Sequence, residues 1–87
     1  MVTVHLPSSL VSLFPGASRQ VRVEAMDVGE VMNRLDERWP GMRMCLCGAG
    51  PSIRRHINVF VDGEKSPLTT PLRPGSVVHI MTAVSGG

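Results

Sequence analysis

The residues best placed to do chemistry are the last two, Gly86-Gly87, which follow Val84 and Ser85 after a strand-like run. Glycine lacks a Cβ and adopts backbone conformations that other residues avoid, so such a tail can enter a narrow channel. It can then bring a carboxylate against the reactive group of another enzyme. At about 3.3–3.6 Å per extended residue, the four-residue segment would reach roughly 13–14 Å. Frayed termini are also commonly Gly-rich. The rest of the sequence is therefore needed to distinguish a functional tail from a frayed end.

Cys45 and Cys47 are the only two cysteines of the chain, and thiolates bind zinc. A zinc site needs about four ligands at workable spacings. Besides the Cys-x-Cys pair, the further candidate ligands are His5, His56 and His79. These histidines are scattered along the sequence and do not provide a convincing second pair of zinc ligands. We therefore expect no metal site.

The same two cysteines bear on cellular location. A secreted mini-protein would carry more cysteines, spaced to close loops, so these are expected to be free thiols in a reducing compartment. The chain opens without the features of a signal peptide, and it has no apolar run near the ~18 residues of a membrane span. The sequence thus predicts a cytoplasmic protein with no membrane association.

Length and composition limit the classes of function that are open to this chain. Its 87 residues fit one domain with a modest core, which would bury roughly 60% of the unfolded surface and leave no room for an internal active-site cleft. A hydrophobic content of 43% excludes a disordered tail. The net charge is +2, and the only adjacent basic pair is Arg54-Arg55, which we interpret as a solvated face. Nucleic acid is therefore not an expected partner.

Four stretches have the residue pattern of β-strands, with alternating residues directed to opposite faces. They are residues 2–6, 19–25, 56–61 and 76–83. Pro7 stops the first, and the second should pair antiparallel with it. Asp62-Gly63 predicts a tight turn after the third. The Pro-broken stretch 64–72 has room for an edge strand or a single turn.

One amphipathic helix is expected over Asp27 to Trp39. Asp27 stands three residues before Glu30, the pattern of a capping box, and Pro40-Gly41 ends the helix. The apolar residues recur at helical spacing, with Trp39 as the expected core anchor. They are Val28, Val31, Met32, Leu35 and Trp39. The charged residues avoid this stripe and are expected to form a solvated face; they are Glu30, Arg34, Asp36, Glu37 and Arg38.

Two longer connections complete the chain. Residues 8–18 form a predicted loop whose apolar content suggests that it folds back over the core, with Phe14 as a plug. Residues 42–55 lack a clean period and contain Gly48-Ala49-Gly50-Pro51, so they are expected to be a variable connection with room for a short helical turn.

This element order predicts an α+β fold in which one helix packs on one face of a mixed sheet. The opposite face should then stay open. The last strand carries apolar groups on both sides, which is typical of a central strand or of a strand that keeps one face for a partner. We expect the open face to display Phe60, His79 and Met81 as a docking face close to the tail.

The whole chain resembles the ubiquitin-like sulfur-carrier proteins of the ThiS/MoaD family. The segments that carry the resemblance are residues 2–6, 27–39, 57–64, 70–78 and the ending 83–87. The resemblance implies a β-grasp fold with a four- to five-stranded sheet whose first and last strands are parallel and adjacent. It also implies a domain over residues 1–83 that presents residues 84–87 as a flexible tail.

The resemblance implies a protein co-substrate rather than an enzyme, with no bound cofactor. An ATP-dependent activating enzyme would adenylate the carboxylate of Gly87, and a sulfur donor would displace AMP to leave a thiocarboxylate. Val84, Ser85 and Gly86 would occupy the channel of a partner. The implied partners are the activating enzyme, a sulfur-acceptor synthase for which pyridoxal phosphate is one option, and a metalloprotease that releases the product in some pathways.

The residues define the biosynthetic pathway that receives the sulfur less closely than they define the family. The two long connections make the chain longer than thiazole-pathway carriers, and residues 80–83 lack the aromatic and Pro residues common in molybdopterin-synthase subunits. Carriers for cysteine biosynthesis or for sulfur-containing natural products are the favoured comparison. The alternatives that stay open are a small subunit of molybdopterin synthase, a protein modifier conjugated through Gly87, and a β-grasp domain with an unused tail.

Overall fold

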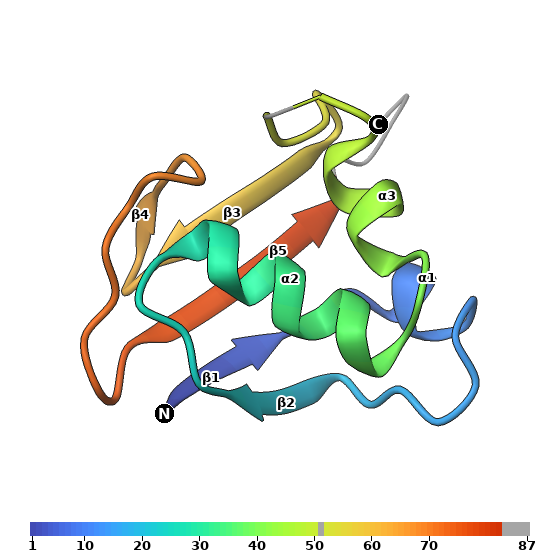
Figure 1. Cartoon of the computed structure of the whole chain (residues 1–87), viewed down its shortest axis with the longest axis horizontal. Helices are drawn as coiled ribbons and strands as arrows, with labels where there is room; N and C mark the ends of the chain where they lie inside the picture. Colours follow the sequence, from blue (N-terminus) through green and yellow to red (C-terminus); the bar gives the residue numbers. More distant parts are fainter. Residues whose placement is uncertain (51, 83–87) are drawn as a thin grey trace.

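The computed structural model describes residues 1–50 and 52–82 of the chain (Figure 1). The predicted tail, residues 84–87, and the domain boundary at residue 83 lie outside the described residues. In chain order the elements are β1 (Val2–His5), α1 (Ser8–Val11), β2 (Gln20–Val23), α2 (Val28–Arg38), α3 (Met42–Cys47), β3 (Ile57–Val61), β4 (Glu64–Lys65) and β5 (Val77–Thr82). In the described part of the chain, no helix has the length and apolar character needed to cross a membrane.

The five strands form one mixed sheet in the order β2-β1-β5-β3-β4. β1 and β5 are parallel neighbours, with His5 opposite His79, while the other strand pairs are antiparallel. The first and last strands of the chain thus lie side by side in the middle of the sheet (Figure 1). This arrangement confirms the predicted β-grasp fold, including the strand pairing that the family resemblance implied.

The core lies between the sheet and the helices α2 and α3, which cover one face of it (Figure 1). Each central strand alternates buried and more exposed residues, so one set of side chains faces the helices. The largest side chains that are under 2% exposed include Met32, Leu35, Met42 and Leu46. The opposite face of the sheet carries the half-buried and exposed set, and no helix or strand among the described residues covers it, as the single layer of helices predicts.

The capping residue of α2 was correctly predicted. The Asp27 Oδ1 atom accepts a hydrogen bond of 2.8 Å from the Glu30 N–H, which satisfies one of the donors that open a helix. The Glu30 carboxylate accepts in return from the N–H of Met26 at 2.6 Å, one residue before the cap. The entry to α2 is therefore fixed by two reciprocal bonds.

Trp39 is not the core anchor that the apolar stripe suggested. It sits at the C-cap of α2 with a φ of −132°, and its ring is only partly buried beside Gly16. At that position the helix has already ended, so the side chain reaches the rim of the core. Met32 and Leu35, both fully buried, anchor α2 instead.

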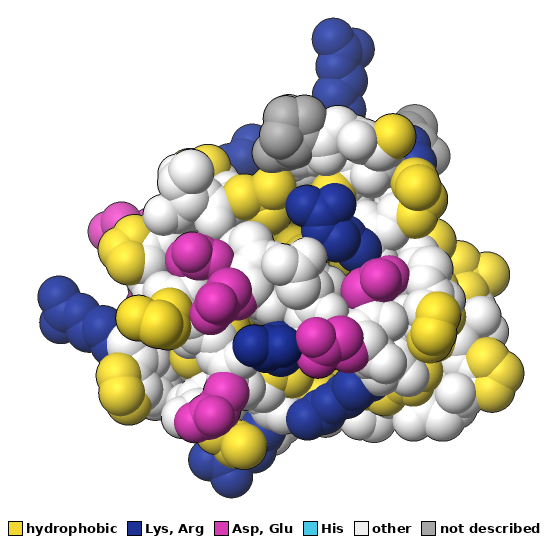
Figure 2. All heavy atoms as spheres, viewed as in Figure 1, with side chains coloured by type: hydrophobic (Ala, Val, Ile, Leu, Met, Phe, Trp, Pro, Cys, Tyr) yellow, Lys and Arg dark blue, Asp and Glu magenta, His cyan; other side chains and the backbone are white. Residues whose placement is uncertain are grey.

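The charged face of α2 is more than a solvated surface. Acidic and basic side chains are interspersed over this helix (Figure 2), and Arg34 forms a 3.0 Å ion pair with Glu37. Arg34 and Arg38 also donate to the carbonyl oxygens of Glu24 and Arg22, which fastens the helix to β2 and the segment that follows it. The charged side chains of α2 thus face the solvent and also connect the helix to β2.

Two helices lie in the predicted connections: α1 falls where a loop was expected, and α3 falls where room was left for a short helical turn. In α1, Leu10 is buried, and Phe14 after it packs partly buried against the core, as expected of a loop that folds back. α3 buries Met42, Leu46 and Cys47 and is a full part of the core. Its N-terminus receives its cap from α2, because Asp36 Oδ1 accepts the N–H groups of Gly41 and Arg43 at 3.0 and 3.1 Å. Asp36 is therefore half-buried and structural, not solvated.

Candidate docking surface

The open face of the sheet brings together the three residues that were predicted to dock a partner. Phe60 of β3 lies opposite His79 of β5, and Met81 follows two residues later on the same face. The side chains line one shallow hollow. Phe60 is half-buried, whereas His79 is exposed and Met81 is 52% exposed. We call the surface formed by Phe60, His79 and Met81 the docking surface, after the role predicted for it.

Sequence reasoning missed that β1 extends this surface. His5 lies opposite His79, and the two ring centroids are 4.4 Å apart with the rings at 66° to each other. The alternation of Val2 to Leu6 already places His5 away from the core. Only the pairing of β1 with β5 reveals that the two imidazoles are neighbours.

The strand β5 connects the docking surface to the tail. It is bonded to β1 on one side and to β3 on the other, and its last described residue, Thr82, precedes residues 83–87. The position of Gly87 and of the channel residues Val84, Ser85 and Gly86 is outside the described residues. What the fold supplies is a central strand that leads from the docking surface directly into that sequence.

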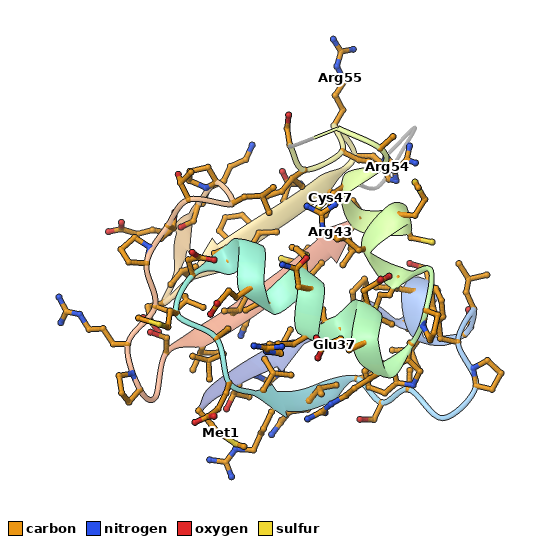
Figure 3. The ribbon with its side chains drawn as sticks, in the orientation of Figure 1. Met1, Glu37, Arg43, Cys47, Arg54 and Arg55 are labelled. Atoms are coloured by element: carbon orange, nitrogen blue, oxygen red, sulfur yellow. The ribbon has the colours of Figure 1, made fainter. Side chains whose placement is uncertain are left out.

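The two cysteines lie away from the docking surface, on α3. Cys47 is buried, and burial raises the pKa of its thiol; the nearby Arg43 and Arg54 guanidinium groups oppose that rise without cancelling it (Figure 3). Arg54 is held there by hydrogen bonds from its Nε to the Met44 carbonyl and from its N–H to that of Leu46. Within residues 1–50 and 52–82, no three His, Cys, Asp or Glu side chains group to hold a metal.

This environment gives a test of thiol reactivity. A raised pKa leaves less thiolate at any given pH, and the thiolate is the form that iodoacetamide attacks. We expect Cys47 to be alkylated at least about tenfold more slowly than Cys45 in the folded protein at pH 8, since burial also blocks access. Peptide mass mapping of a time course measures both rates. Equal rates in the folded protein would contradict the burial of Cys47, and equal rates in denaturant serve as the control.

A five-stranded mixed sheet in the order β2-β1-β5-β3-β4, with helices on one face, is the fold of a ubiquitin-like protein. A model of the ThiS family matches residues 4–87, and the chain belongs to that family. No curated protein sequence matches it.

Three solved structures show the similarity in detail. The CysO chain in the BexX/CysO complex of Amycolatopsis orientalis is 27% identical, with all of both chains covered and a TM-score of 0.89. CysO of Mycobacterium tuberculosis is 27% identical over 97% of this chain and 100% of its own, with a TM-score of 0.85. SAMP1 of Haloferax volcanii is 27% identical over 99% of this chain and 98% of its own, with a TM-score of 0.83. The protein is thus a ubiquitin-like sulfur carrier similar to CysO and SAMP1.

Proposed function

We propose that this protein is a co-substrate whose terminal carboxylate, on Gly87, is converted to a thiocarboxylate that donates sulfur to a small metabolite. The observation that carries the proposal is the ThiS-family match over residues 4–87, which runs through the Gly-Gly ending that follows β5. The carrier performs no catalysis of its own in this scheme. Its contributions are docking through the sheet and reach through the tail.

The chemistry proceeds in two transfers on the Gly87 carboxyl group. A carboxylate oxygen attacks the α-phosphorus of ATP in the activating enzyme, which forms an acyl-adenylate and releases pyrophosphate. A sulfide or persulfide sulfur then attacks the acyl carbon and displaces AMP; a persulfide also needs a thiol to cleave its S–S bond. The product is a sulfur nucleophile on a tether, which the partner holds in position for reaction.

Glycine at positions 86 and 87 fits this role on steric grounds. A channel that closes around bare backbone excludes side chains, so it admits Gly-Gly and shields the reactive acyl group from water. The activating enzyme, the acceptor synthase and, where the product is released from the carrier, a metalloprotease are the proposed partners. ATP belongs to the activating enzyme, and we propose no cofactor bound to the carrier.

The similarity to CysO favours a cysteine-type pathway or a sulfur-containing natural product as the destination of the sulfur. One of these CysO proteins was solved in a complex with BexX, which supports a carrier that docks to separate partners. A second candidate function is protein modification through Gly87, which is supported by the similarity to SAMP1, a small archaeal modifier protein. A permanent subunit of molybdopterin synthase is the remaining alternative, and it would co-purify with its partner in a stable stoichiometric complex.

Intact-mass analysis tests the main proposal. After incubation with ATP, a sulfur source and activating enzymes of the CysO, SAMP1 and thiazole-pathway types, the carrier should gain about 16 Da as sulfur replaces one oxygen. The absence of this gain with all of them would reject the proposal. Immunoblots that show high-mass adducts which vanish without Gly87 would favour the modifier function instead.

The docking surface gives a separate prediction. Met81→Asp should weaken binding to the activating enzyme by at least about tenfold, or about 1.4 kcal/mol, because a carboxylate would be buried in an apolar interface. The fold should be unaffected, since Met81 is 52% exposed. Met44→Asp is the matched control, because Met44 on α3 is 53% exposed on the helical side of the molecule. Equal affinities of the two variants by calorimetry would show that the docking surface lies elsewhere.

A further inference from the structure

A second hollow of the open face lies where β1 ends beside β5, and its lining differs from the rest of the surface. His5, His79 and Met81 all contribute to this hollow, together with Arg19. The remaining lining comes from residues without charge: Leu6, Pro7, Ser8, Ile80 and Thr82. Two imidazoles in contact and one thioether side chain thus line the same hollow.

The separation of the two imidazoles is close to that of two histidine ligands on one metal ion. Their ring centroids are 4.4 Å apart, with the rings at 66° to each other. With metal–nitrogen bonds of about 2.0 Å, two imidazoles on one ion place their centroids about 4.5–5.5 Å apart as the angle at the metal widens from 90° to 120°. The observed separation of 4.4 Å lies at the lower end of this range.

Met81 is placed to supply the third ligand. It follows His79 by two residues on β5, so both side chains are directed to the same face of the sheet. The methionine side chain is unbranched and has three rotatable bonds, so its sulfur can approach an ion held by the two imidazoles. Its 52% exposure leaves it free to do so.

We propose that His5, His79 and Met81 bind one copper(I) ion. A thioether is a soft ligand that selects copper(I), and imidazole also suits copper. No carboxylate from the described residues lines the hollow, and Arg19 is the one basic residue besides the histidines among its described lining. Both features disfavour hard or divalent cations such as Mg²⁺ and Zn²⁺ relative to a monovalent soft ion.

Copper bound at this site would occupy part of the docking surface, because His79 and Met81 belong to both. If the proposed docking is correct, copper(I) and the activating enzyme exclude each other. The metal site itself does not depend on the sulfur-carrier chemistry. Its test uses the carrier alone and requires neither an activating enzyme nor the residues beyond Thr82.

The first test is a copper(I) titration under anaerobic, reducing conditions, followed by proton NMR. It uses the full chain with Cys45→Ser and Cys47→Ala, because the two free thiols would otherwise compete for the metal. The chain has three histidines, so the ring resonances of His5, His56 and His79 can be assigned by His→Asn substitution of each. Copper(I) is diamagnetic, and we expect the resonances of His5 and His79 to shift and saturate at one equivalent. The resonances of His56, which is exposed and precedes β3, should not move. No shift of His5 and His79, or an equal shift of His56, would overturn the proposal.

The second test measures affinity by competition with the chromophoric chelator bicinchoninate. It is carried out in a Cys45→Ser, Cys47→Ala background, because cysteine thiolates also bind copper(I). His79→Asn and Met81→Leu should each lower the affinity for copper(I) at least about tenfold, while His56→Asn should leave it unchanged. Circular dichroism checks that each variant is folded. Equal affinities of all four proteins would show that the copper is bound elsewhere.

Discussion

Deletion of Gly87 is expected to slow the mass gain of about 16 Da that accompanies thiocarboxylate formation by at least about a hundredfold. The truncated chain still ends in a glycine carboxylate, that of Gly86, but this group is recessed by about 3.3–3.6 Å along the extended tail. Misplacement of a reacting group by about 1 Å can cost a factor of roughly 100 in rate. The shortened tail should therefore react at least about a hundredfold more slowly with ATP, sulfur donor and activating enzyme, by time-resolved intact-mass measurement.

The control for this deletion is Ser85→Ala, which changes a side chain but keeps the length of the tail. It should retain most of the rate, because the side chain at this position is already small. A truncated chain that is converted as fast as the full-length protein would show that reach is not what the tail provides. The loss of conversion in both variants would instead indicate that Ser85 contributes through its hydroxyl group.

Leu35→Ala should be the most destabilising single truncation in α2, with a loss of about 2–5 kcal/mol in the free energy of unfolding. Leu35 is fully buried between the helix and the sheet, so the substitution removes transfer free energy and leaves a cavity. A domain of this kind has only about 5–15 kcal/mol of stability in total. Urea denaturation followed by circular dichroism measures the change.

Leu13→Ala is the matched control for this prediction. Leu13 is 66% exposed after α1, so the same truncation there should change the free energy of unfolding by less than about 0.5 kcal/mol. A similar loss from both substitutions would mean that Leu35 does not occupy the core position described above.

The main helix and the four longer strands were predictable because each carries its own local signal. The capping pair Asp27 and Glu30 marks the start of α2, and the strands alternate or stand between turn residues. α3 had no such signal. Its N-cap is Gly41, whose side chain can cap nothing, and the capping oxygen comes from Asp36 on the preceding helix. Sequence patterns for helix starts search for a capping side chain within one turn of the first helical residue. They therefore do not find a cap that comes from the preceding helix.

The docking surface was partly predictable for a similar reason. Alternation within β3 and β5 places Phe60, His79 and Met81 on the face away from the core, and the pairing of β3 with β5 confirms that they meet. The contact between His5 and His79 depends on a parallel pairing of strands that are more than seventy residues apart in the sequence. The alternation of residues predicts which side chains of a strand share a face. Only the order of the strands in the sheet shows which side chains on different strands are neighbours.

The central position of β5 determines how the protein responds to a pull on its tail. A force applied beyond Thr82 acts along β5, whereas the hydrogen bonds that hold this strand to β1 and β3 lie across it. Such bonds share the load and must break together, in shear, instead of opening one at a time from the end. Mechanical resistance of this kind slows forced unfolding. A partner that holds the tail, as we propose, would therefore load β5 in shear and could release the carrier without unfolding it.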